Sequence, residues 1–163
     1  MADEIRTDRL VLRRARLDDA PAMHRIMSDP LAMEYWSTPP HQKLAETEHW
    51  IASMVEADAN RDDFIVTLDG QLIGKFGAWR LPEFGFLLDP RHWRKGYASE
   101  AMIGFIAHRR ASGSTELTAD VDPRNLSSIR LLERHGFAET GRANGTWQVG
   151  DQLCDSVYFR LQL

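Results

Sequence analysis

The sequence predicts a mixed α/β domain whose sheet carries helices on both faces. Its 163 residues suit one domain that buries a core without metal or disulfide staples. Hydrophobic residues make up 43% and charged residues 27%, which is typical of a globular protein. The apolar pattern changes repeatedly between the periods of strands and helices. No repeat, low-complexity tract or linker divides residues 1–163, so we expect one domain.

The first part of the chain predicts a strand, two helices and a loop between them. The run RLVLR at residues 9–13 has the apolar character of a strand. Asp18 or Asp19 can cap a helix with an apolar face. Residues 30–42 contain three prolines and predict a loop. A second helix is expected at residues 44–57. The chain then changes to the strand period.

The remaining elements alternate between strands and helices. An Asp-Gly pair at 69–70 predicts a hairpin turn, and Gly113 is a typical residue after a helix end. In chain order we expect strands at 64–68, 71–79 and 84–88, a helix from Gly96, a strand at 116–121, a helix at 127–135, and strands at 137–142 and 154–161. This order predicts a mixed sheet of about seven strands.

Composition excludes several functional classes. The net charge of −4 does not favour nucleic acid as a partner. One cysteine, Cys154, permits no intrachain disulfide, so a reducing, cytoplasmic setting is the simpler interpretation. No run of about 18 apolar residues predicts a membrane span, and the first residues do not resemble a signal peptide. The six histidines lack metal-ligand spacing, so we expect no metal.

The most informative segment is FGFLLDPRHWRKGYASEAM at residues 84–102. An apolar strand leads into a proline turn, a basic loop and a glycine that opens a helix. The first N–H groups of a helix lack intrahelical partners and carry partial positive charge, so this arrangement suits a pyrophosphate. The alternative is a basic helix cap whose glycine serves only the turn. Neither a Walker loop nor a three-glycine dinucleotide fingerprint is present.

Three motifs carry a resemblance to a known family. WRKGYA at 93–98 resembles the acyl-CoA loop Q/R-x-x-G-x-G/A of GNAT acetyltransferases, although Trp93 departs from the usual first residue. The continuation SEA, the stretch NLSSIRLLERHGF at 125–137 and the opening TDRLVLRRARLDDA at 7–20 resemble the branch of ribosomal-protein N-terminal acetyltransferases. The motifs occur in the family's order and cover most of the chain.

The resemblance implies a GNAT fold, with a mostly antiparallel sheet and a splayed acyl-CoA cleft, and acetyl-CoA as the donor. The backbone of Phe86, Leu87 and Leu88 would pair with the pantetheine arm. The remaining implied cofactor-binding residues are Arg91, Arg94, Lys95, Gly96, Tyr97, Ala98, Ser99, Asn125 and Ser128. For Asn125 the alternative is a plain helix cap.

The resemblance also suggests how protons move. Many GNAT enzymes place a tyrosine near the departing thiolate, but that position here is Leu132. Ser128 stands where the branch is thought to use a serine instead, or it is a small helix residue bonded to its own backbone. Glu83 is the leading base candidate, with an exposed strand-end carboxylate as the alternative. Glu100 is less attractive because it lies on the cofactor helix beside basic residues.

An aromatic wall is expected to hold the acceptor amine. Tyr35, Trp36, Trp79 and Trp147 are its candidates, although each alone is more often part of a core. The acceptor could be a protein N-terminus, a polyamine, an amino-sugar drug or another small amine. Two rival functions stay open, a non-catalytic acyl-CoA-binding module of the same fold and a nucleotide-binding regulator. The sequence does not decide whether the terminal strands form a homodimer.

Overall fold

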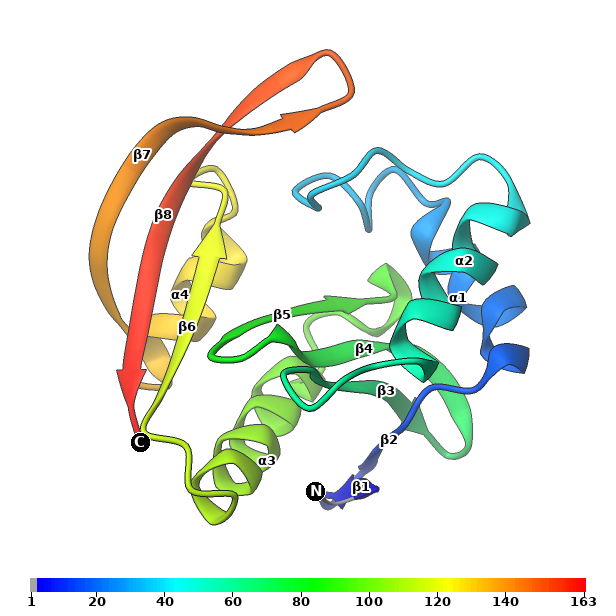
Figure 1. The fold of residues 1–163 in the computed structure, drawn as a ribbon, viewed down its shortest axis with the longest axis horizontal. Helices are drawn as coiled ribbons and strands as arrows, with labels where there is room; N and C mark the ends of the chain where they lie inside the picture. Colours follow the sequence, from blue (N-terminus) through cyan, green and yellow to red (C-terminus); the bar gives the residue numbers. More distant parts are fainter. Residues whose placement is uncertain (1–2) are drawn as a thin grey trace.

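The computed structural model describes residues 3–163, and within that range it has one sheet of eight strands with four α-helices (Figure 1). The strands are β1 (Glu4–Arg6), β2 (Leu10–Arg13), β3 (Asp62–Leu68), β4 (Gln71–Arg80), β5 (Glu83–Leu88), β6 (Glu116–Val121), β7 (Ala138–Val149) and β8 (Gln152–Gln162). The helices are α1 (Ala20–Met27), α2 (Leu44–Val55), α3 (Tyr97–Ala111) and α4 (Leu126–Arg134). The mixed α/β class that the sequence predicts is confirmed.

The strand order is β1-β2-β3-β4-β5-β6-β8-β7. Neighbouring strands are antiparallel except β5 and β6, which are parallel. The sequence analysis missed β1, because three residues with one buried side chain, Ile5, show no detectable alternation. It also ended β7 too early, because most of that edge strand is exposed and polar. No helix within residues 3–163 is long and apolar enough to cross a bilayer.

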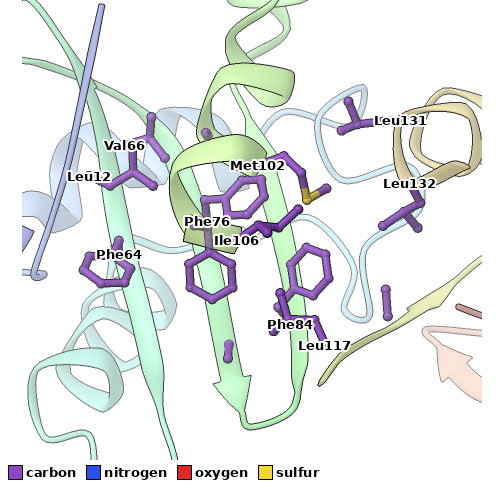
Figure 2. Close-up of a cluster of buried hydrophobic side chains, with 14 of the residues drawn as sticks. Leu12, Phe64, Val66, Phe76, Phe84, Met102, Ile106, Leu117, Leu131 and Leu132 are labelled. Carbon is purple, nitrogen blue, oxygen red and sulfur yellow. The ribbon is translucent and has the colours of Figure 1, made fainter. Parts of the chain in front are cut away.

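Two apolar clusters cover the two faces of the sheet. The larger cluster packs α3 and α4 against the strands, and Figure 2 shows Phe76 and Phe84 within it. Phe76 stacks on Phe84, and Phe105 meets Phe76 edge-on and lies tilted to Phe84. The smaller cluster packs α1 and α2 against Ile65 and Leu87 on the other face. Since side chains alternate along a strand, Glu83 and Gly85 share the α1 and α2 face with Leu87.

The start of α1 differs in detail from the predicted cap. Asp19 precedes the helix, but its carboxylate makes no capping bond to it. Instead the carboxylate accepts hydrogen bonds from the Arg13 guanidinium at 2.7 and 2.9 Å and from the Arg16 backbone N–H at 2.8 Å. The aspartate therefore ties a short 3₁₀ turn, Leu17–Asp19, to β2.

The sheet opens between β5 and β6. In residues 3–163 the register between these strands pairs Glu83 with Thr118 alone, and the Thr118 N–H donates to the Pro82 carbonyl at 3.0 Å. Beyond that point β5 stays paired with β4 and β6 stays paired with β8. Figure 1 shows β5 and β6 running in different directions from there. The backbone of Phe86 to Leu88 therefore borders an opening on the side toward β6.

Candidate active site

A folded loop connects β5 to α3 at the mouth of this opening. Asp89 is buried, and its carboxylate accepts from the Arg91 backbone N–H at 3.0 Å and from the Arg91 guanidinium at 2.6 Å. The Trp93 indole N–H donates to the Leu88 carbonyl at 2.9 Å. These bonds fold the loop back over the end of β5 and hold it in front of the first turn of α3.

Two residues of this loop have left-handed backbone conformations. Arg94 has φ of 59° and Gly96, the residue before α3, has φ of 81°. Glycine adopts this conformation without the steric cost of a Cβ atom, which accounts for Gly96 in the motif. The turn leaves Arg94, Lys95 and Gly96 exposed beside the N–H groups that open α3. This is the local geometry of an anion site at a helix N-terminus.

Several of the predicted cofactor-binding residues form hydrogen bonds to other residues of the protein. The Arg91 guanidinium is held by Asp89, and the Ser99 hydroxyl lies 2.7 Å from His135 Nε2. Asn125 precedes α4, and its side-chain oxygen accepts from the Ser128 N–H at 3.2 Å, as in the capping alternative. Ser128 is partly exposed in the first turn of α4.

Leu132 lies one helical turn beyond Ser128 and is fully buried in the larger apolar cluster (Figure 2). A side chain at this position of α4 packs into the core. Leu132, which the resemblance aligns with a tyrosine, is therefore a core residue in this chain.

Glu83 is the first residue of β5, at the end of the strand away from the loop. The Trp79 indole N–H donates to Glu83 Oε1 at 3.0 Å. Burial raises the pKa of Glu83, and the nearby negative charge of Asp120 raises it as well, while the bond from Trp79 works in the other direction. A carboxylate with a raised pKa binds a proton more readily, as a general base requires.

Asp120 forms a second pair of the same kind on β6. The Trp147 indole N–H donates to Asp120 Oδ2 at 2.9 Å, which joins the β7–β8 hairpin to β6. The buried residues of β6, Leu117, Ala119 and Val121, face α3 and α4, so Asp120 faces the same side as Glu83. Two carboxylates, each bonded to a tryptophan, thus lie on opposite edges of the opening.

A pocket of about 340 Å³ lies beside Glu83. Its lining residues are Glu83, Glu116, Thr118, Ala119, Thr140, Tyr158, Phe159 and Arg160. The sequence analysis found Glu83 but missed Asp120, Thr140 and Tyr158. Asp120 pairs with Tyr158 across β6 and β8, and that register cannot be deduced from the residues alone. The carboxylate of Glu116 is paired with Arg160, which leaves Glu83 as the carboxylate of this pocket without a cation bound to it in the described chain.

The four predicted aromatic residues have different partners. Trp79 and Trp147 bond to the two carboxylates and are 47% and 37% exposed, so part of each ring remains open to solvent. Trp36 packs against the smaller apolar cluster, with Lys75 Nζ 5.9 Å from its ring centre. Tyr35 lies 5.6 Å from the Arg124 guanidinium in the turn before α4. The loop between α1 and α2 thus contacts the turn that precedes α4.

A buried ion pair that the sequence analysis missed lies under the opening. Lys75 is 2% exposed, and its Nζ atom is 2.7 Å from Asp63 Oδ1 and 3.3 Å from the Gly85 carbonyl. A Cβ atom added at Gly85 would meet no heavy atom of the described residues within 4 Å beyond its chain neighbours. Gly85 therefore leaves free space on the sheet face next to Glu83.

Three histidines in the described part of the chain have partners of their own. Residues 3–163 contain no group of three or more His, Cys, Asp and Glu side chains that could hold a metal ion. His24 and His41 each contact the Thr47 hydroxyl, at 2.8 and 2.7 Å, and His108 contacts Asp62 at 2.7 Å. These histidines have structural partners.

Comparisons with known proteins show which family and which fold this chain resembles. Residues 9–138 match the acetyltransferase (GNAT) domain family. An uncharacterized N-acetyltransferase of Bacillus licheniformis is 30% identical over 95% of this chain and 93% of its own. An acetyl transferase of Salmonella typhimurium that modifies the N-terminal serine of a 50S ribosomal subunit protein has a similar fold, with a TM-score of 0.86, 15% identity and 96% of each chain covered. The ribosomal-protein acetyltransferase RimL in complex with coenzyme A has a TM-score of 0.85, at 17% identity and 98% coverage of both chains.

Proposed function

This chain belongs to the GNAT acetyltransferase family, and we propose that it transfers an acetyl group from acetyl-CoA to a primary amine by direct attack. One observation carries the proposal: β5 leaves β6 directly before a basic loop that opens a helix. The opening offers unpaired backbone to an extended pantetheine arm, and the loop offers positive charge and free N–H groups to a pyrophosphate. A neighbour of the same fold was solved with coenzyme A, which supports this donor.

The donor would lie along β5 with its thioester near the point where the strands part. Phe86, Leu87 and Leu88 would contact the pantetheine arm, and Arg94, Lys95 and Gly96 the pyrophosphate, with Tyr97, Ala98 and Ser99 beside them. Arg91 would contribute a charge that Asp89 already holds in place. No metal is needed for this chemistry, because the helix N-terminus and the basic side chains supply the positive charge.

The transfer step has a balanced set of proton movements. The amine nitrogen attacks the thioester carbon, a C–N bond forms, and the C–S bond then breaks. In our proposal the Glu83 carboxylate accepts a proton from the amine, directly or through water, and its raised pKa suits that task. The Ser128 hydroxyl donates a hydrogen bond to the departing thiolate, and the proton held by Glu83 passes to that thiolate through water or is released to solvent while solvent protonates the thiolate. The products are an amide and coenzyme A.

A cationic acceptor fits the charges around the opening. An alkyl amine is mostly protonated at neutral pH, because its reference pKa is about 10. Glu83 and Asp120 would attract that cation, and the Trp79 and Trp147 rings would flank it. We propose a protein N-terminus or a small-molecule amine as acceptor, since proteins of this fold include the transferase that modifies a ribosomal N-terminal serine.

An acceptor screen tests the proposed function. The protein is mixed with acetyl-CoA and, in separate wells, with N-terminal peptides, polyamines, aminoglycosides and simple amines, and free thiol is measured. We expect thiol release above the amine-free control for at least one class. Binding of acetyl-CoA without turnover in any well would contradict the proposal and favour the non-catalytic acyl-CoA module. A preference for ATP over CoA would favour the nucleotide-binding regulator.

A further inference from the structure

We propose that Arg9 is a positioning residue for the donor loop, and that it acts through an ion pair with Glu100 on α3. The inference rests on the proposed function, since it concerns the loop assigned to the donor pyrophosphate. It also gives a role to the TDRL stretch at the start of the chain, which the chemistry of the site leaves unused.

The contacts around Glu100 form the first part of the argument. Its Oε1 atom accepts from the Thr7 hydroxyl at 2.5 Å and from the Arg9 backbone N–H at 2.7 Å. Its Oε2 atom accepts from Arg9 Nε at 2.7 Å. Gly104, one turn further along α3, has no side chain, and a Cβ there would come within 3.0 Å of Thr7. The glycine therefore allows the Thr7–Arg9 segment to lie directly on the helix.

The same guanidinium also contacts Lys95 in the loop and Tyr97 at the start of α3, and it lies beside Gly96 between them. Arg9 Nη1 donates to the Lys95 carbonyl at 3.0 Å. The guanidinium carbon lies 4.5 Å from the centre of the Tyr97 ring. The Nη2 atom is 3.3 Å from the place where a Cβ on Gly96 would be. One planar side chain thus bridges the first turn of α3 to the loop in front of it.

Two physical reasons make this bridge relevant to donor binding. Arg94 has a left-handed backbone that is unfavourable for a residue with a Cβ atom, so the loop needs an outside restraint to keep it. Glu100 also brings a negative charge to the first turn of α3, where a pyrophosphate would be repelled. Burial would raise the pKa of Glu100, but hydrogen bonds from Thr7 and Arg9 outweigh it and keep the group ionised. The Arg9 charge then offsets that carboxylate.

The test compares two donors that differ in the pyrophosphate. Dissociation constants for acetyl-CoA and for acetyl-pantetheine, which lacks the pyrophosphate, are measured by calorimetry. We expect Arg9→Ala to weaken acetyl-CoA binding on the order of tenfold to hundredfold, the range expected when hydrogen bonds to charged groups are lost. Acetyl-pantetheine binding should change less than about twofold, because that ligand lacks the pyrophosphate that the loop would hold and so loses no such bond. Arg6→Ala is the matched control, since Arg6 pairs with Glu4 on the same segment.

Two further variants keep the test decisive if Arg9→Ala does not fold. Arg9→Lys keeps the charge but loses the planar bridge. Glu100→Gln keeps one acceptor oxygen for the Thr7 hydroxyl and the Arg9 backbone N–H, but it replaces the oxygen that pairs with Arg9 Nε by an N–H donor and so loses the ion pair. In each variant, acetyl-CoA binding should weaken, but by less than in Arg9→Ala, and acetyl-pantetheine binding should stay nearly unchanged. The melting temperature should stay close to that of the wild type. Equal weakening of both donors, or no weakening of acetyl-CoA, would overturn the inference. A wild-type protein that binds no acetyl-CoA would instead overturn the proposed function.

Discussion

The proposed donor site comes mostly from one continuous segment of the chain, whereas the proposed acceptor site combines residues that lie far apart in the sequence. Apart from Arg9, Asn125 and Ser128, the donor site is continuous, from the end of β5 through the loop to the first turn of α3. The acceptor site combines Trp79 and Glu83 from the β4–β5 hairpin with Asp120 on β6 and with Trp147 and Tyr158 on the last two strands. The acceptor side therefore depends on strand register and on how two hairpins approach each other.

This difference indicates which residues the local chemistry fixes, those of the donor loop, and which residues can vary, those of the acceptor side. The donor loop needs a glycine, basic residues and a helix start, all within a few residues. The acceptor side requires only that side chains from several strands lie close together. Such side chains can be substituted with little cost to the stability of the fold. Substitutions at the donor loop should affect every reaction of this protein, whereas substitutions on the acceptor side should affect some amines more than others.

The largest effect should come from Gly96→Glu. A side chain at this left-handed position strains the loop, and a carboxylate there repels the pyrophosphate. For the wild type, acetyl-CoA at a hundred times its Kd should add about 2.7 kcal/mol of stability. That corresponds to a rise in melting temperature of roughly 5 to 10 °C. We expect no rise for the variant in a thermal-shift measurement. An unchanged rise would remove the loop from the donor site.

The next largest effects should come from Glu83→Gln and Ser128→Ala. General acid–base groups typically contribute about 10² to 10⁴ in rate, so each variant should lose about 3 to 5 kcal/mol of transition-state stabilisation. Acetyl-CoA affinity should change much less. Higher pH should restore part of the Glu83→Gln rate, because it supplies neutral amine, and should not restore Ser128→Ala. If steady-state kinetics put both variants within about threefold of wild type, water carries the protons and orientation supplies most of the rate.

Trp147→Phe should have a smaller effect, confined to the acceptor side. The substitution keeps an aromatic ring but removes the N–H that bonds to Asp120. Hydrogen bonds to charged groups contribute about 1.5 to 3 kcal/mol, so the KM for the amine should rise by roughly tenfold or more. The KM for acetyl-CoA should stay constant. An equal rise in both constants would show that the hairpin serves the donor as well.

Two substitutions should move the pH profile in opposite directions. The base works only when ionised, so kcat/KM, expressed per neutral amine, should fall with falling pH through the raised pKa of Glu83. Asp120→Asn removes a negative neighbour that raises this pKa, so the fall should move to lower pH. Trp79→Phe removes a hydrogen bond that lowers it, so the fall should move to higher pH. Each displacement should be within about one pH unit. Profiles that do not move would exclude Glu83 as the base.

The smallest effect should come from metal removal. The proposed chemistry uses protein groups alone, so activity after dialysis against EDTA should equal activity before it. Loss of turnover on chelation, with recovery when zinc is added, would require a different mechanism in which a metal ion takes part.

The sequence predicted the parts of the fold that local pattern encodes. The apolar spacing in α3 predicts an inward face of Ala98, Ala101, Met102, Phe105 and Ile106; the last four are buried, Ala98 is partly buried, and Gly96 directly precedes the helix. The strand β1 was missed because it is very short. The outer part of β7 was missed because its side chains face solvent, and its pairing with β8 shifts register twice.

The acceptor side shows the limit of prediction most clearly. The sequence indicated Trp79 and Trp147 as aromatic candidates. Of their two carboxylate partners, only one could be recognised from the sequence. Glu83 follows Trp79 by four residues in a hairpin and stands out in the sequence, whereas Asp120 meets Trp147 only through the pairing of β6, β8 and β7. The loss of tyrosine at Leu132 suggested a missing acid, and only the packing of α4 shows that the side chain at this position enters the core.

Transfer of an isotopically labelled acetyl group tests the account most directly. The protein is incubated with labelled acetyl-CoA and the best amine from the acceptor screen, and thiol and product are followed together by absorbance and mass spectrometry. The account predicts one labelled amide for each thiol released, with both signals lost in Gly96→Glu and strongly reduced in Glu83→Gln. Thiol release without labelled amide, or donor binding without any thiol release, would contradict it.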